Sequence, residues 1–158
     1  MPNLQGPKPG DAAPAFTLPA PGGEVALGAG TGGKTVLYFY PRDDTPGCTT
    51  EALDFTTEAA AFAAAGVTVI GVSKDSVQKH EKFIAKHGLG VVLASDEHGT
   101  TAENYGVWVE KNMYGKVHMG VERATFLIDA AGVVRQVWRK VKVKGHVADV
   151  LRAAQALD

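Results

Sequence analysis

Short apolar runs separated by turn residues recur along the chain. They are rich in β-branched or aromatic residues and predict strands at 36–40, 67–72, 91–93, 124–129 and 133–138. The first run is unbroken, as expected of a central strand that is covered on both faces. The pattern between the first two runs is rich in Ala and Glu and predicts one helix from about Thr49 to Ala65, with Gly66 at its end. A strand, a helix and a strand with short connections predict a right-handed parallel βαβ unit.

The helices are expected to bury an apolar stripe against the sheet. The side chains available for the stripe of the long helix are Leu53, Phe55 and Phe62. A second helix is expected to begin at Asp75, a possible N-cap with Gln78 three residues later, and to end at Gly88. The last helix covers about 146–157.

Two pairs of runs predict β-hairpins. Near the N-terminus, extended pieces at 15–18 and 24–27 flank the turn sequence Pro21-Gly22-Gly23. Near the C-terminus, the last two strands are joined by 130–132, a spacing that indicates an antiparallel pair. The whole pattern predicts an α/β, thioredoxin-like fold: a mixed central sheet flanked by helices, with an N-terminal β-hairpin. Residues 1–158 are expected to form a single domain.

Charge and hydropathy exclude several kinds of partner. Lys and Arg number 16 against 17 Asp and Glu, which gives a formal net charge of −1 and no electrostatic reason to expect nucleic acid or an anionic membrane. No window approaches the roughly 20 apolar residues that a membrane-spanning helix needs. The start of the chain lacks the basic and apolar regions of a signal peptide. We therefore expect a cytoplasmic protein that acts on a small or uncharged substrate.

Cys48 is the only cysteine in the 158 residues. It follows a run of turn residues, at the junction of the first predicted strand and the long helix. If Thr45 is the N-cap, Pro46 takes the first helical position and Cys48 lies in the first turn. Backbone N–H groups and the partial positive charge at a helix N-terminus favour a thiolate, which is the nucleophilic form. The alternative is that Cys48 is a small buried hydrophobe without chemistry.

The surroundings of Cys48 narrow the chemistry. The turn lies beyond the carboxyl end of the first core strand, where open α/β sheets place their sites. Gly47 leaves room for a small substrate to approach backbone N–H groups. A Cys-x-x-Cys disulfide exchanger is excluded, because Thr45 and Glu51 stand where its second cysteine would be.

The segment from Phe39 to Glu51 resembles the peroxiredoxins, whose signature is Pro-x-x-x-Thr-x-x-Cys. It is most similar to their bacterioferritin comigratory protein subfamily. Three other segments, 10–18, 71–77 and 120–129, also match, in the family's order. The resemblance covers nearly the whole chain.

The resemblance implies that Cys48 is the peroxidatic cysteine, whose thiolate attacks a hydroperoxide and becomes a sulfenic acid. It also implies that Thr45, Arg123 and the backbone N–H groups of Gly47 and Cys48 donate hydrogen bonds to the peroxide oxygens. Arg123 is far from Cys48 in the sequence, so their proximity is an expectation from the family alone. The residues alone, without the resemblance, would favour a solvated surface position for Arg123 and a helix-capping role for Thr45.

The resemblance implies roles for two further residues. Pro41 would shield the thiolate from water, although it could simply end the strand. Glu51 matches a carboxylate that orients the arginine in relatives, although it could simply complement the helix N-terminus.

The chain departs from many relatives in having no resolving cysteine: Leu53 and Ile84 stand where relatives carry one. Unless two chains pair through Cys48, the resemblance therefore implies a one-cysteine peroxiredoxin whose sulfenic acid is reduced by an external thiol. That thiol could be thioredoxin, glutaredoxin with glutathione, or another small thiol. We expect a monomer or a weak homodimer. No cofactor is expected, and no metal, because metal-ligand spacing is absent from the histidines, which are His80, His87, His98, His118 and His146.

Two other functions compete with the peroxidase. One is a redox-inactive thioredoxin-fold protein that binds clients, in which Cys48→Ser would behave like the parent. The other is a peroxide sensor that passes oxidation from Cys48 to a partner protein and recycles poorly with general reductants.

Overall fold

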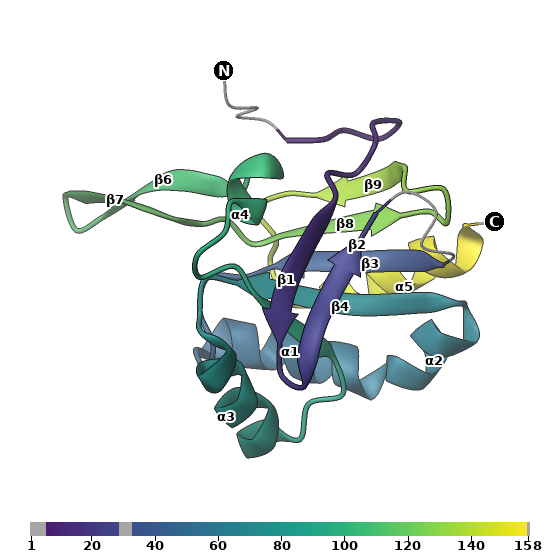
Figure 1. Ribbon diagram of the computed structural model, residues 1–158, viewed down its shortest axis with the longest axis horizontal. Helices are drawn as coiled ribbons and strands as arrows, with labels where there is room; N and C mark the ends of the chain where they lie inside the picture. The colour runs from purple at the N-terminus through teal and green to yellow at the C-terminus, as the bar shows by residue number, and fades with distance from the viewer. Residues whose placement is uncertain (1–5, 29–32, 158) are drawn as a thin grey trace.

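A five-stranded mixed sheet forms the centre of the computed structural model, which describes residues 6–28 and 33–157 (Figure 1). Its strands in spatial order are β5 (Val92–Ser95), β4 (Val67–Ser73), β3 (Lys34–Phe39), β8 (Ala124–Ile128) and β9 (Val134–Trp138). The first three are parallel, and β8 runs antiparallel to both of its neighbours. The predicted mixed sheet, βαβ unit and C-terminal hairpin are confirmed.

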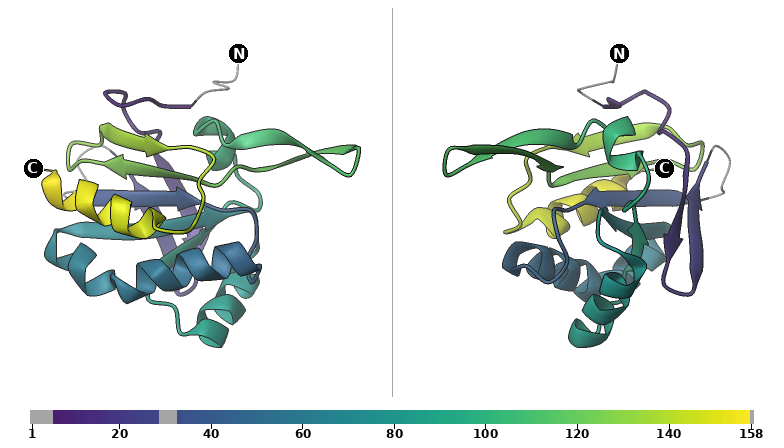
Figure 2. Two further views of the ribbon diagram at one scale, coloured as in Figure 1. Left: turned by 180° about the vertical axis from the view of Figure 1, so that it is seen from behind. Right: turned by 60° about the vertical axis from the view of Figure 1, so that its left-hand side comes forward.

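Each face of the sheet is covered by a different layer. The predicted N-terminal hairpin is confirmed as β1 (Phe16–Ala20) and β2 (Gly23–Leu27). With the short helix α4 (Thr101–Asn104), it covers one face. The other face is covered by α1 (Pro46–Thr57), α2 (Ala59–Ala64) and α5 (His146–Ala156), as the view from behind in Figure 2 shows. Helix α3 (Val77–His87) lies beside them and buries Phe83 in the same core.

The helix predicted over 49–65 is wrong in two respects. It is interrupted at Glu58, whose φ of −96° and ψ of 11° separate α1 from α2. Glu58 is followed by three alanines, so no residue type in the sequence marks the break. Leu53 is also 38% exposed, and Glu51 is buried on α1 in company with Ala52 and Phe55.

The predicted N-cap of α3 is also wrong. Ser76 caps the helix, its side chain accepting a hydrogen bond from the Lys79 N–H. The Asp75 carboxylate instead accepts hydrogen bonds from the Ser73 hydroxyl at 2.6 Å and from the Asp43 N–H at 2.8 Å. Asp75 therefore links β4 to the loop that precedes Cys48.

Sequence patterns did not predict α4 or a third hairpin, β6 (Trp108–Met113) and β7 (Lys116–Val121). The hairpin projects past the ends of the central strands (Figure 1). Its strands carry many polar residues and bury little, so they lack the apolar runs that predicted the other strands. The strands are joined by a two-residue turn, in which Tyr114 and Gly115 have φ values of 54° and 77°. The glycine of this turn is the one local feature of the sequence that favours a hairpin.

Candidate active site

The start of α1 places Cys48 in its first turn. Thr45 is the N-cap, with extended backbone angles of −94° and 156°, and Pro46 is the first helical residue, as predicted. The Thr45 side chain does not cap the helix, however, because its hydroxyl donates a hydrogen bond to the Arg42 carbonyl at 3.0 Å. The first turn is closed by the hydrogen bond from the Thr49 N–H to the Thr45 carbonyl.

The structure brings Arg123 against Cys48. The guanidinium Nη2 donates to the Cys48 Sγ at 3.3 Å, and Cys48 is only 2% exposed. Strand pairing explains this proximity. Phe39, the last residue of β3, lies opposite Ala124, the first residue of β8. Arg123, which directly precedes β8, therefore lies at the same end of the sheet as the loop that leads from β3 to Cys48.

Glu51 holds the other side of the same guanidinium. It lies on α1 close to one turn after Cys48, is fully buried, and accepts a hydrogen bond from Arg123 Nη1 at 2.7 Å. Burial raises the pKa of Glu51 to about 7, although the positive charge of Arg123 opposes the shift. Burial alone would lower the pKa of Arg123, but the negative charges of Glu51 and Cys48 outweigh it and raise that pKa overall. Arg123 is therefore a permanent cation held between the carboxyl group of Glu51 and the sulfur.

Two polar atoms near this ion pair have no hydrogen-bond partner among the described residues. They are the second carboxylate oxygen of Glu51, Oε2, and the Tyr38 hydroxyl. Burial, followed by the charges of Glu51 and Cys48, raises the pKa of Tyr38 well above its ordinary value. The phenol therefore stays protonated beside the site, and sequence patterns did not single it out because Tyr38 lies inside an apolar strand.

Gly47 and Pro41 take up different positions around the thiol. A Cβ atom on Gly47 would lie 3.1 Å from Arg123 Nη2, so the missing side chain leaves the guanidinium its place. Pro41 is exposed and lines a cleft of about 440 Å³, together with Arg42, Thr45 and several residues of the β6–β7 hairpin. The shielding of the thiolate by Pro41 stays a prediction.

The cleft also contains a basic residue that sequence patterns missed. Lys111 of β6 lines it, and its ammonium donates a hydrogen bond to the Val121 carbonyl at 2.6 Å. Burial and the nearby charge of Arg123 lower the pKa of Lys111. Among the described residues, no cluster of three or more His, Cys, Asp or Glu side chains could hold a metal ion. No helix of the described chain is both long and apolar enough to span a bilayer.

Comparison with known proteins gives one consistent result. The model of the AhpC/TSA family matches residues 9–137, a range that includes both Cys48 and Arg123. The chain is 52% identical over 143 residues to a putative peroxiredoxin Bcp of Coxiella burnetii, covering 90% of this chain and 95% of that protein. It is 49% identical over 144 residues to peroxiredoxin Bcp of Bacillus subtilis, covering 90% and 92%.

A solved structure agrees. The bacterioferritin comigratory protein of Xanthomonas campestris, studied for its alkyl peroxide reduction activity, is 46% identical to this chain and superposes with a TM-score of 0.84. The alignment covers 89% of this chain and 90% of that one. The chain therefore belongs to the AhpC/TSA family, within its Bcp-type peroxiredoxins of thioredoxin-like fold, and is a thiol-dependent peroxidase.

Proposed function

We propose that the protein is a one-cysteine peroxidase that reduces hydrogen peroxide and organic hydroperoxides at Cys48. The observation that carries the proposal is the guanidinium of Arg123, 3.3 Å from the Cys48 sulfur and paired with buried Glu51. The thiolate attacks one peroxide oxygen, so that an S–O bond forms as the O–O bond breaks. The leaving hydroxide or alkoxide takes up a proton, and Cys48 becomes a sulfenic acid. The alkyl peroxide reduction studied in the Xanthomonas campestris relative supports organic hydroperoxides as substrates.

The surrounding donors stabilise the charge that moves to the peroxide oxygens. Cys48 is the third residue of α1, so the N–H groups of Gly47 and Cys48 are among those left free at the start of a helix. Arg123 acts with them, and so does Thr45 if its hydroxyl turns from the Arg42 carbonyl to the peroxide. These donors accelerate the step to the extent that they bind the transition state better than the resting thiolate. Glu51 orients the guanidinium, and Pro41 limits the access of water.

An external thiol completes the cycle. The sequence contains one cysteine, so the sulfenic acid has no resolving partner within the chain. One thiol condenses with the sulfenic acid to give a mixed disulfide and water, and a second thiol releases Cys48 and leaves with the first as a disulfide. We propose thioredoxin, or glutaredoxin with glutathione, as the reductant. We place the protein in the cytoplasm, where it acts in redox homeostasis as a single domain, monomeric or weakly dimeric.

The test is the consumption of hydrogen peroxide with dithiothreitol as reductant. Cys48→Ser should abolish turnover, and Arg123→Lys should lower it by roughly a hundredfold, the usual cost of losing one transition-state donor. Arg135→Lys is the matched control, because Arg135 is an exposed arginine of β9 outside the site and the change should leave the rate unaltered. Equal background rates in the parent and Cys48→Ser would overturn the proposal and favour a client-binding protein. Rapid oxidation without recycling would favour a sensor.

A further inference from the structure

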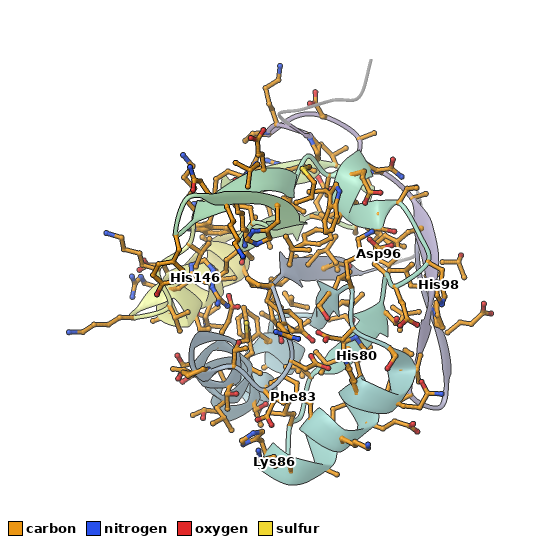
Figure 3. All side chains as sticks on the ribbon, turned by 90° about the vertical axis from the view of Figure 1, so that its left-hand side faces the viewer. His80, Phe83, Lys86, Asp96, His98 and His146 are labelled. Atoms are coloured by element: carbon orange, nitrogen blue, oxygen red, sulfur yellow. The ribbon has the colours of Figure 1, made fainter. Side chains whose placement is uncertain are left out.

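His80 is a fully buried side chain on α3 whose two ring nitrogens both have partners. Nδ1 lies 2.6 Å from the Oδ2 atom of Asp43, in the loop before Cys48, and Nε2 lies 3.0 Å from the Ala94 carbonyl oxygen of β5. Figure 3 shows His80 on the side of α3 that faces the rest of the molecule. The imidazole therefore bridges the central sheet and the active-site loop.

The partners determine where the protons lie. A carbonyl oxygen only accepts, so His80 Nε2 must carry a hydrogen. A single proton then lies between Nδ1 and the Asp43 carboxylate, and on whichever atom it rests, the charges of the two side chains cancel. Removing either partner would take away the 2.6 Å contact of a buried polar atom, Nδ1 of His80 or Oδ2 of Asp43. The pair is thus a strong attachment for the loop.

Asp43 is held from two further elements. Its Oδ1 atom accepts a hydrogen bond from the Tyr40 hydroxyl at 2.5 Å, and its backbone N–H donates to the Asp75 carboxylate at 2.8 Å. Tyr40 follows β3 and Asp75 follows β4, whereas His80 belongs to α3. The position of Asp43 is therefore fixed from three directions.

The next residue is held as well, but at the surface. Asp44 has a left-handed backbone with φ of 60°, and its carboxylate accepts hydrogen bonds from Lys86 Nζ at 2.7 Å and His87 Nε2 at 2.8 Å. These hydrogen bonds lower the pKa of Asp44. Lys86 lies farther along α3 than His80 (Figure 3). Because these groups are exposed, this second attachment is weaker than the buried one.

We propose that His80 is a positioning residue of the peroxidase: by holding Asp43, it fixes the active-site loop and the first turn of α1, and so keeps Cys48 buried against Arg123. The inference rests on the proposed function, in which Cys48 alternates between peroxide and an external thiol. A peroxide is small enough to reach the sulfur of a residue that is only 2% exposed, whereas a protein thiol needs the sulfur at the surface. The attachment therefore favours oxidation by peroxide and limits the opening that mixed-disulfide formation requires.

The experiment compares how fast Cys48 reacts with a large and a small alkylating reagent, a polyethylene-glycol maleimide and iodoacetamide. In His80→Gln, the ratio of the large-reagent to the small-reagent rate should rise about tenfold, or about 1.4 kcal/mol in the opening equilibrium. Asp43→Asn should have a similar effect, and the double variant should add little, because both changes break one attachment. Oxidation by hydrogen peroxide should slow in all three.

Hydrogen exchange separates a positioning role from general destabilisation. In His80→Gln, the amides of 43–50 should exchange faster while those of β3 and β4 keep their protection. His98→Gln is the matched control: its side chain is 89% exposed and pairs with Glu97, so both rates should stay at parental values. Alkylation of Cys48 does not require peroxidase activity, so the labelling ratio still tests the role of His80 even if the proposed function is wrong.

Two results would overturn the inference. One is a folded His80→Gln protein with an unchanged labelling ratio and unchanged exchange at 43–50. If that variant does not fold, Tyr40→Phe removes only the hydroxyl that is bonded to Asp43 and must raise the ratio in the same direction. An unchanged ratio in Tyr40→Phe is the second contradicting result.

Discussion

Glu51 occupies a position on α1 that an apolar side chain would fill if stability alone mattered. It shares the buried face of the helix with Cys48, Ala52 and Phe55, and one of its carboxylate oxygens has no hydrogen-bond partner among the described residues. A buried ion pair that is incompletely satisfied contributes little to stability, because desolvation offsets the attraction between the charges. What Glu51 does provide is a fixed orientation for Arg123 at the sulfur. We therefore propose that Glu51 serves the proposed chemistry rather than the stability of the fold.

Gly47 allows stability and activity to be separated at one residue. In Gly47→Ala, the added Cβ would lie 3.1 Å from Arg123 Nη2, so the guanidinium must move by a few tenths of an ångström. Alanine is the better helix former by about 1 kcal/mol. We expect the melting temperature to stay the same or rise, while the rate of Cys48 oxidation falls by about tenfold because the donor is misplaced. Thermal denaturation and stopped-flow oxidation by hydrogen peroxide measure the two effects.

Gly90→Ala is the matched control for this change. Gly90 lies outside the helices, and its added Cβ would meet only the Thr56 methyl group, at 3.4 Å. Its oxidation rate should equal that of the parent. A Gly47→Ala variant that reacts at the parental rate would show that the close approach to Arg123 has no catalytic consequence.

At the scale of elements, the sequence was informative wherever a local pattern decides the structure. The five apolar runs and the short turns between paired strands were sufficient for the core strands and two hairpins. No residue type marks the break at Glu58, and the polar β6–β7 hairpin has no apolar run, so a reading of apolar runs predicts neither. Cys48 could be found from its own neighbours, whereas the position of Arg123 depends on strand pairing and could be expected only from the family. The contact between Asp43 and His80 joins a loop to a helix and was missed for the same reason.

The contact between β8 and α5 predicts a pH dependence of stability. His146, the first residue of α5, is buried, and its Nε2 atom lies 2.8 Å from the Thr125 hydroxyl of β8. Burial lowers the pKa of His146 to about 4 from an ordinary 6.5, so the folded protein keeps the ring neutral where the unfolded chain protonates it. The contribution of His146 is therefore complete above pH 6.5 and lost as the pH falls towards 4. Urea unfolding at several pH values in this window measures the loss.

A variant isolates this effect from other groups. The raised pKa of Glu51 acts in the opposite direction over an overlapping window, with stability lost as the pH rises towards about 7. His146→Gln retains a group that can hydrogen-bond to Thr125 but cannot titrate. The difference in unfolding free energy between parent and variant should shrink as the pH falls from 6.5 to 4. A constant difference would mean that His146 does not titrate differently in the two states.

At the scale of the whole molecule, one sulfur must serve both halves of the proposed cycle. The chain has no second cysteine, and Cys48 is buried at the start of α1 beneath a loop that is attached to α3 through Asp43 and Asp44. A sulfenic acid formed there has no internal thiol with which to condense, so its lifetime depends on an external thiol and on opening of the loop. A second molecule of peroxide is as small as the first, so we expect it to reach the sulfenic acid by the same route.

We therefore expect excess peroxide to convert the sulfenic acid of Cys48 to the sulfinic acid, one peroxide transferring an oxygen atom and leaving as water. Intact-mass measurement should show a two-oxygen adduct at high peroxide when thiol is absent. Excess dithiothreitol should suppress the adduct, because reduction of the sulfenic acid then outpaces the second oxidation. Cys48→Ser should show no such adduct, which separates the reaction at the thiol from oxidation of methionine. If the parent also acquires no two-oxygen adduct at high peroxide, the buried site protects its own sulfenic acid, and the absence of a resolving cysteine does not make this peroxidase sensitive to its substrate.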